Sequence, residues 1–152
     1  MKYTPGDAQK GGAESALHAS AWSGDTSHVR SLIASGADVH FVDSSGESAI
    51  HGASAWGNVE VVGLLLAAGA NPNLAESSGL TPLHWAASHG NLETIDLLIA
   101  HGADPLAINV AGETPAAIAA RYKRLVMAEY LQKLTANIAV NADAPKAARP
   151  SP

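Results

Sequence analysis

Apolar residues recur along this chain in short blocks whose spacing matches one face of an α-helix. In the block over 92–99, Leu92, Ile95, Leu98 and Ile99 fall at helical spacing. Positions three and four apart share a helix face, so this block predicts a short helix with one buried side. The block over 59–66 has the same spacing, and each block follows a shorter alanine-rich segment. The pattern predicts pairs of short helices.

The residues that bound these segments recur with a period of 33. A fixed period between about 20 and 50 residues indicates supersecondary units that stack on one another. The recurring residues that we expect to be structural are His18, His51, His84, Gly57, Gly69, Gly90 and Gly102.

Local signals define the unit. Thr81 can cap a helix, and Pro82 then occupies the first helical position, where its missing N–H costs nothing. Gly90 is expected to end this helix with a positive φ, and Asn91 can cap the next one. Gly102 is expected to end that second helix. The unit is therefore predicted to be helix, tight turn, helix and loop.

The segment Thr81 to Ala86 reads Thr-Pro-Leu-His-Trp-Ala, and altered copies occur at 48–53 and 15–20. With the 33-residue period and the glycine register, this segment resembles the signature of the ankyrin repeat family. The resemblance implies an all-α solenoid with hairpin-like loops. It also implies that the signature histidine hydrogen-bonds the backbone of a neighbouring loop.

We expect an ankyrin repeat domain over 13–135, with flexible tails over 1–12 and 136–152. Its four repeats are predicted at about 13–45, 46–78, 79–111 and 112–135. The first and last repeats have polar substitutions typical of caps, whose outer faces meet water. In the last one, Leu125, Ala128 and Leu131 are expected to face inward, and Arg124 to face water. Capped ends favour a monomer.

Composition sets the class of protein. The chain has no cysteine, so it has no disulfide framework and no thiolate metal site. No apolar run approaches the roughly 20 residues that span a bilayer. The first residues lack the apolar core of a secretory signal. We therefore expect a soluble intracellular protein without a membrane segment, in the cytoplasm or the nucleus.

Charge is unevenly distributed. Residues 13–110 contain ten acids and one base, Arg30, which gives 1 − 10 = −9. Such an acidic body repels phosphate backbones, which argues against nucleic-acid binding. Two interpretations stay open: the charge keeps the protein soluble, or it attracts a basic protein partner.

No catalytic or metal centre is predicted. Stacked helices lie about 8–10 Å apart, so the repeated histidines cannot share a zinc ion whose ligand bonds are about 2 Å long. No phosphate-binding loop, nucleophile elbow or serine–histidine–aspartate set is present. We expect no cofactor and no enzymatic activity.

The resemblance implies that partners meet the loop tips and the first helix of each repeat. Tryptophan, tyrosine and arginine are the residue types that most often anchor interfaces. The predicted partner-binding residues are Trp22, Asp43, Glu47, Trp56, Glu76, Ser78, Leu80, His89, Arg121 and Tyr122. For Trp22 the alternative is shielding of the N-terminal cap, and Trp85 is expected to pack against the next repeat.

The sequence thus predicts a non-catalytic protein–protein interaction module that serves as an adaptor, an inhibitor or an assembly chaperone. The alternative is a small-molecule or lipid binder with a pocket near Trp22 and Trp56. An enzyme is the weakest alternative. His40 and Asn73 occupy the loop slot that an oxygenase hydroxylates in some animal ankyrin repeats, and the sequence does not decide whether they are modified.

Overall fold

The computed structural model describes residues 13–143 and contains eight helices in this range. They are α1 (Ala13–Ser23), α2 (Thr26–Ala34), α3 (Ala49–Trp56), α4 (Val59–Ala67), α5 (Pro82–His89), α6 (Leu92–Ala100), α7 (Pro115–Arg121) and α8 (Leu125–Asp143). The described residues form no strand, and one isolated bridge joins Val42 to Ser48. The predicted all-α solenoid is confirmed. No helix in this range is both long and apolar enough to span a membrane.

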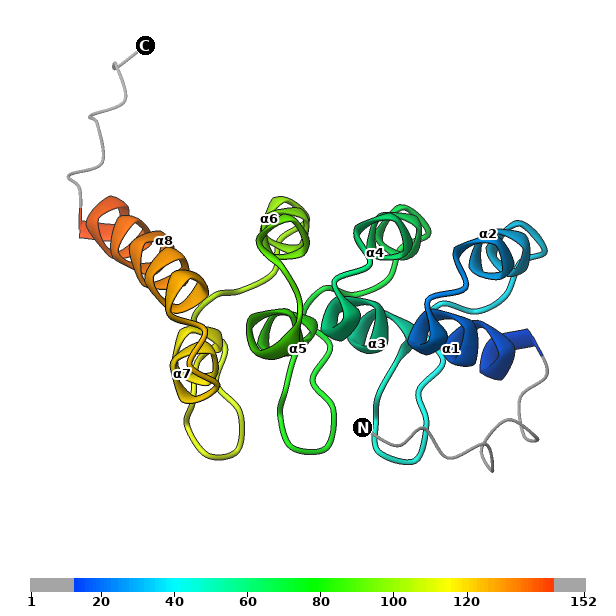
Figure 1. Cartoon of the computed structure of the whole chain (residues 1–152), viewed down its shortest axis with the longest axis horizontal. Helices are drawn as coiled ribbons and strands as arrows, with labels where there is room; N and C mark the ends of the chain where they lie inside the picture. The colour runs from blue at the N-terminus through cyan, green and yellow to red at the C-terminus, as the bar shows by residue number, and fades with distance from the viewer. Residues whose placement is uncertain (1–12, 144–152) are drawn as a thin grey trace, which may run out of the picture.

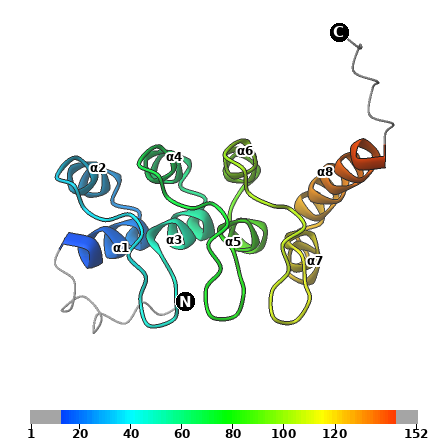
Figure 2. The same cartoon turned by 180° about the vertical axis from the view of Figure 1, so that it is seen from behind.

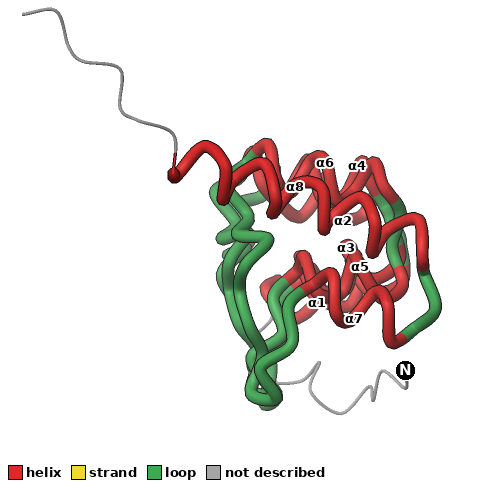
Figure 3. The backbone as a smooth tube through the Cα atoms, turned by 90° about the vertical axis from the view of Figure 1, so that its left-hand side faces the viewer, coloured by secondary structure: helices red, strands yellow, loops and turns green. Residues whose placement is uncertain are grey.

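The helices form two layers that run the length of the array (Figures 1 and 2). The first helix of each pair, α1, α3, α5 or α7, lies in an inner row, and the second lies in an outer row. Figure 3, viewed along the stack, shows the connecting loops at one side, extending past the inner row. We call the inner helices together with these loops the inner surface.

The core is a set of apolar columns that repeat with the period of the sequence. Leu17, Ile50 and Leu83 occupy one column and are almost completely buried. A second column contains Val29, Val62 and Ile95, which have no exposed surface. Each repeat therefore buries its apolar face only against its neighbours, which is why the stack folds as one unit.

Polar side chains at the tight turns join consecutive repeats. Asn91 caps α6 by accepting the Thr94 N–H, and its amide nitrogen donates to the Gly57 carbonyl at 2.9 Å. In the last repeat the Arg124 guanidinium donates to the Gly90 carbonyl at 2.6 Å. The expectation that Arg124 only faces water is therefore wrong, because it replaces the bridging asparagine of the preceding repeat.

The signature histidines link the inner helices to the loops. His51 Nδ1 accepts the Ser48 N–H at 3.0 Å, and Nε2 lies 2.9 Å from the Leu74 carbonyl. His84 Nε2 lies at the same distance from the Glu113 carbonyl. Neither histidine side chain has exposed surface. Burial lowers the pKa of His51 to about 4 and lowers that of His84, so both rings are neutral at pH 7.

The C-terminal end differs from expectation. Helix α8 continues to Asp143, beyond the expected end of the array at residue 135, so 136–143 is helical and not a flexible tail. Leu125, expected to face inward, is 71 % exposed, because it lies at the first position of α8. Ala128 and Leu131 are buried as expected. The predictions for 1–12 and 144–152 concern residues outside the described range.

Gly90 has a structural role for a reason different from the predicted one. Its φ is −79°, so it does not adopt the left-handed conformation, whereas Gly57 and Gly102 have φ of 65° and 93°. A Cβ at position 90 would lie 2.5 Å from the Ser54 carbonyl oxygen and 2.9 Å from the Ala86 backbone. Close contact with the preceding repeat therefore requires glycine here.

We expect Gly90→Ala to destabilise the protein by about 2–3 kcal/mol, because two backbones must separate to admit the methyl group. Gly102→Ala should cost about 1 kcal/mol, because it meets left-handed strain but no atom within 4 Å. Urea denaturation of both variants measures the difference. A loss at Gly102 equal to or larger than that at Gly90 would contradict this account.

Stability should fall as pH drops from about 6.5 towards 4, because the unfolded histidines bind protons there and the buried ones do not. The stabilisation is complete above the unfolded pKa and decreases by up to about 1.4 kcal/mol per pH unit for His51. Urea denaturation across this range measures the slope. His51→Gln, which can still cap the helix, should flatten the slope, and an unchanged slope in this variant would contradict the assignment to His51.

Candidate functional site

A continuous row of aromatic rings crosses the inner surface from the first repeat to the last. We call it the aromatic row; in spatial order it consists of Phe41, His18, Trp22, Trp85, His89 and Tyr122. Neighbouring ring centroids lie between 5.1 and 6.4 Å apart, and most pairs meet edge to face. A pair such as Trp22–Trp85 stabilises by about 0.5–1.5 kcal/mol beyond its buried area.

The row depends on one glycine in α3. Gly52 is buried, and a Cβ there would lie 2.5 Å from the Trp22 indole. With no side chain at Gly52, the ring of Trp22 lies across α3 and meets Trp85 of α5 at 5.8 Å. This contact does not follow from the repeat pattern, because the two tryptophans are two repeats apart. Its signal was the unusual glycine within the altered signature at 48–53.

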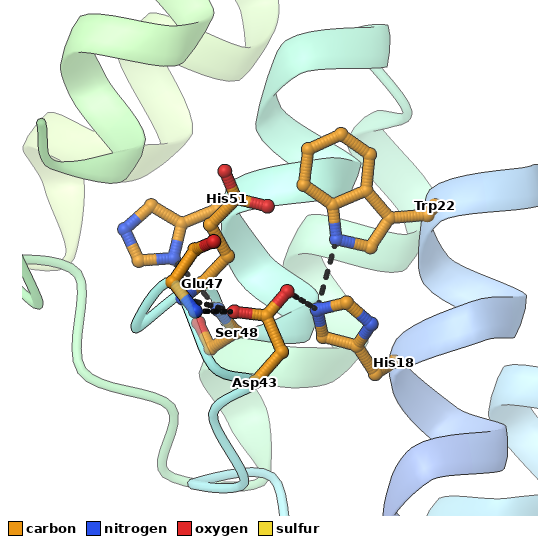
Figure 4. Close-up of polar contacts among 7 residues, drawn as sticks. His18, Trp22, Asp43, Glu47, Ser48 and His51 are labelled. Carbon is orange, nitrogen blue, oxygen red and sulfur yellow. Dashed lines mark hydrogen bonds and ion pairs between the residues drawn. The ribbon is translucent and has the colours of Figure 1, made fainter. Parts of the chain in front are cut away.

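Figure 4 shows how Trp22 is held at its polar edge. Its Nε1–H donates to His18 Nε2 at 3.2 Å, and Asp43 Oδ2 lies 3.6 Å from the same nitrogen. Asp43 Oδ1 accepts the backbone N–H groups of Ser45 and Glu47, each at 2.9 Å. His18 Nε2 cannot accept from Trp22 and donate to Asp43 at the same time, so the hydrogen bond to His18 is what holds Trp22, and His18 lies beside the first loop.

Two of the acids predicted to bind a partner have internal roles. Glu76 is only 9 % exposed, and its Oε1 accepts the N–H groups of Ser78 and Leu80 at 2.9 Å. Asp43 has the same role in the first loop. The expectation that both carboxylates are open to a partner is therefore wrong, because each one accepts backbone N–H groups of its own loop.

Glu47 differs from these two acids. It is half-buried, and burial followed by the charges of Asp43 and Glu76 raises its pKa. No hydrogen bond to its carboxylate occurs among the described residues. A cation placed beside Glu47 would relieve this repulsion, so Glu47 is the loop acid best suited to contact a basic group.

Several predicted partner residues are accessible. Trp56 is 65 % exposed at the end of α3, and Tyr122 is 49 % exposed after α7. Arg121 lies over the Tyr122 ring at 5.5 Å and forms an ion pair with Glu113 at 3.3 Å. His89 is also exposed as a residue. Its ring is partly buried, and this partial burial, followed by the nearby charge of Arg124, lowers its pKa.

The remaining predicted residues, Ser78 and Leu80, differ in exposure. Ser78 is exposed, whereas Leu80 is half-buried and lines a hollow of about 60 Å³ beside Trp85. Trp85 was expected to pack against the next repeat, but its ring contacts are with Trp22 of the first repeat and His89 of its own helix. Its Nε1 is buried without a hydrogen-bond partner among the described residues. A hollow of this size has room for a water molecule.

A larger hollow, of about 470 Å³, lies at the N-terminal end of the array. Trp22 and Trp56 form part of its wall, and Asp25 lies at the start of α2. Inside it, Ser20 Oγ lies 2.8 Å from His28 Nδ1. Trp56, which is not part of the aromatic row, faces this hollow.

The inner surface is rigid and combines aromatic with polar side chains. Within residues 13–143, no three potential ligands among histidine, aspartate and glutamate lie close enough together to hold a metal ion. Exposed aliphatic side chains extend the surface at the third loop, where Ile108 and Val110 are 62 % and 80 % exposed. Aromatic anchors beside exposed loop tips are typical of protein-binding surfaces.

Comparison with known proteins agrees with this architecture. The family model described as ankyrin repeats (3 copies) matches residues 4–76 and 64–142. No curated protein matches the chain. Ankyrin repeats generally act as protein–protein interaction modules, and the family is typically non-enzymatic. Since the family model covers nearly the whole chain, the protein belongs to the ankyrin repeat family.

Proposed function

We propose that this protein is a non-catalytic binding module that holds another protein against its inner surface. The observation that carries the proposal is the aromatic row, whose exposed end at His89 and Tyr122 lies on the same row of helices as Trp56. Large, rigid aromatic side chains supply contact area with little loss of conformational freedom.

The surface is organised before binding. Ring contacts, the Trp22–His18 hydrogen bond and the loop carboxylates fix side chains that would otherwise have to be ordered by the partner. Each immobilised side chain costs about 0.5–1.5 kcal/mol when binding must order it. Rigid display therefore favours affinity.

The charge distribution supports a basic partner. Residues 13–110 have a net charge of −9, and their only base, Arg30, is paired with Glu60. The bases Arg121, Lys123, Arg124 and Lys133 lie in the last repeat. A basic segment would therefore be drawn to the first three repeats and repelled by the last.

This function is compatible with an adaptor, an inhibitor or an assembly chaperone, each of which covers a partner surface without chemistry. We propose that the protein acts as an intracellular monomer. The family generally binds proteins, and the acidic surface gives nucleic acid no attraction.

A small-molecule or lipid binder is the second candidate, favoured by the hollow of about 470 Å³ near Trp22 and Trp56. Its volume falls within the range of about 300–1,000 Å³ that is usual for ligand pockets. Native mass spectrometry of the purified protein tests it, because a retained ligand would shift the intact mass. A mass equal to that of the bare chain after gentle purification contradicts this candidate.

Trp56→Ala should weaken binding of the partner by about 2 kcal/mol, if Trp56 is an interface anchor. The free energy of unfolding should change by less than about 0.5 kcal/mol, because the side chain is mostly exposed. The partner is first captured from a lysate of the source organism, and its affinity is then measured by calorimetry. Val126→Ala, also at an exposed site, is the matched control. Unchanged affinity with lower stability would assign Trp56 to packing.

Association with the captured partner should slow by about tenfold or more between low and physiological salt, because screening weakens attraction between exposed charges. Stopped-flow or surface-based kinetics measures the rate. Glu47→Gln should reduce this salt dependence, and Glu129→Gln, which makes the same charge change at the opposite end of the array, should not. An association rate independent of salt would exclude electrostatic steering.

A further inference from the structure

The hollow at the N-terminal end combines apolar walls with one open carboxylate. Its walls include Trp22, Trp56 and the small side chains of Ala16 and Ala19. Apolar walls of this kind match an aliphatic stem or an aromatic ring. The two tryptophans add an electrostatic preference, because an indole ring attracts a cation that reaches its face.

The hollow contains one carboxylate, that of Asp25, and one of its oxygens is without a hydrogen-bond partner among the described residues. Ser20 Oγ is engaged with His28 Nδ1 at 2.8 Å. Asp25 Oδ1 accepts the His28 N–H at 3.0 Å and so caps α2. Oδ2 of Asp25 has no hydrogen-bond partner among the described residues. This oxygen therefore remains available to a donor that enters the hollow.

The surroundings favour a positive donor over a neutral one. The repeats that carry the hollow belong to the region whose net charge is −9. The one base of this region, Arg30, already pairs with Glu60. Lysine and arginine combine a long aliphatic stem with a cationic head, which matches apolar walls that end at a carboxylate.

We propose that this hollow binds a lysine or arginine side chain of the partner protein. The stem lies along Ala16 and Ala19, and the cationic head lies against Trp22 and Trp56 and faces Asp25. This inference rests on the proposed function, which it narrows to a partner with a basic side chain at this end of the interface.

The experiment uses short peptides in place of the partner. The ¹⁵N-labelled full chain is titrated with acetyl-Gly-Gly-X-Gly-Gly-amide, where X is arginine or lysine, and with the neutral analogues that carry citrulline or norleucine. A charged peptide should shift the indole N–H signals of Trp22 and Trp56 saturably and bind at least about fivefold tighter than its neutral analogue. Equal binding of neutral and charged peptides, or no saturable shift, would overturn the proposal.

Two variants separate the hollow from the general field of the protein. Asp25→Asn removes the charge but keeps a residue that caps helices equally well. Glu129→Gln makes the same charge change on α8, at the opposite end of the array (Figure 1). Asp25→Asn should weaken binding of the charged peptide by about threefold or more, and Glu129→Gln should leave it unchanged. Equal losses in both variants contradict a specific subsite.

The failure of this inference can be told apart from the failure of the proposed function. If the peptides do not discriminate but Trp56→Ala still releases the captured partner, the binding surface stands and the cation subsite is wrong. If Trp56→Ala keeps the partner bound, the proposed surface itself is wrong, whatever the peptides show.

Discussion

The close approach of consecutive inner helices is the constraint on which the rest of this structure depends. Ser54 and Gly90 come so near that a single methyl group at position 90 would overlap the preceding backbone. At the same turns, Asn91 and Arg124 each donate a hydrogen bond to a carbonyl of the repeat before. Helices this close bury their apolar columns fully, and each repeat is fixed relative to its neighbour by backbone contacts as well as by packing.

This approach also makes the candidate site. Because α3 carries glycine at position 52, the Trp22 ring of the first repeat lies across α3 and reaches Trp85 in the third repeat. Contacts of the other rings then connect the first repeat to Tyr122 in the last. The rings belong to elements that the stack already holds rigid, so their positions do not depend on a partner. A binding surface built in this way changes shape little when it is occupied.

The repeat period, the helices and the structural histidines could be predicted from the sequence, because they follow from local spacing and from one signature at Thr81–Ala86. The aromatic row could not, because Trp22 and Trp85 belong to different repeats and occupy different register positions. Gly90 shows a second limit: a glycine in the sequence signals either a positive φ or a close approach of two backbones, and the two cases look the same in the sequence. Arg124 shows a third limit: it keeps the register of Asn91 and bridges to the preceding repeat, but a charged side chain near a turn signals exposure to water and not a bridge.

The acids of the inner surface can attract a partner at a distance even where their oxygens are not available for direct contact. Asp43 and Glu76 direct a carboxylate oxygen to their own loop N–H groups, so they have little left to offer a partner at short range. Their charges nevertheless persist, and charge acts over about 8–10 Å at ordinary salt. We infer that all three loop acids attract a basic partner during approach, whereas only Glu47, together with the aromatic side chains, also makes contacts. The rate of encounter would then depend on more of these acids than the lifetime of the complex does.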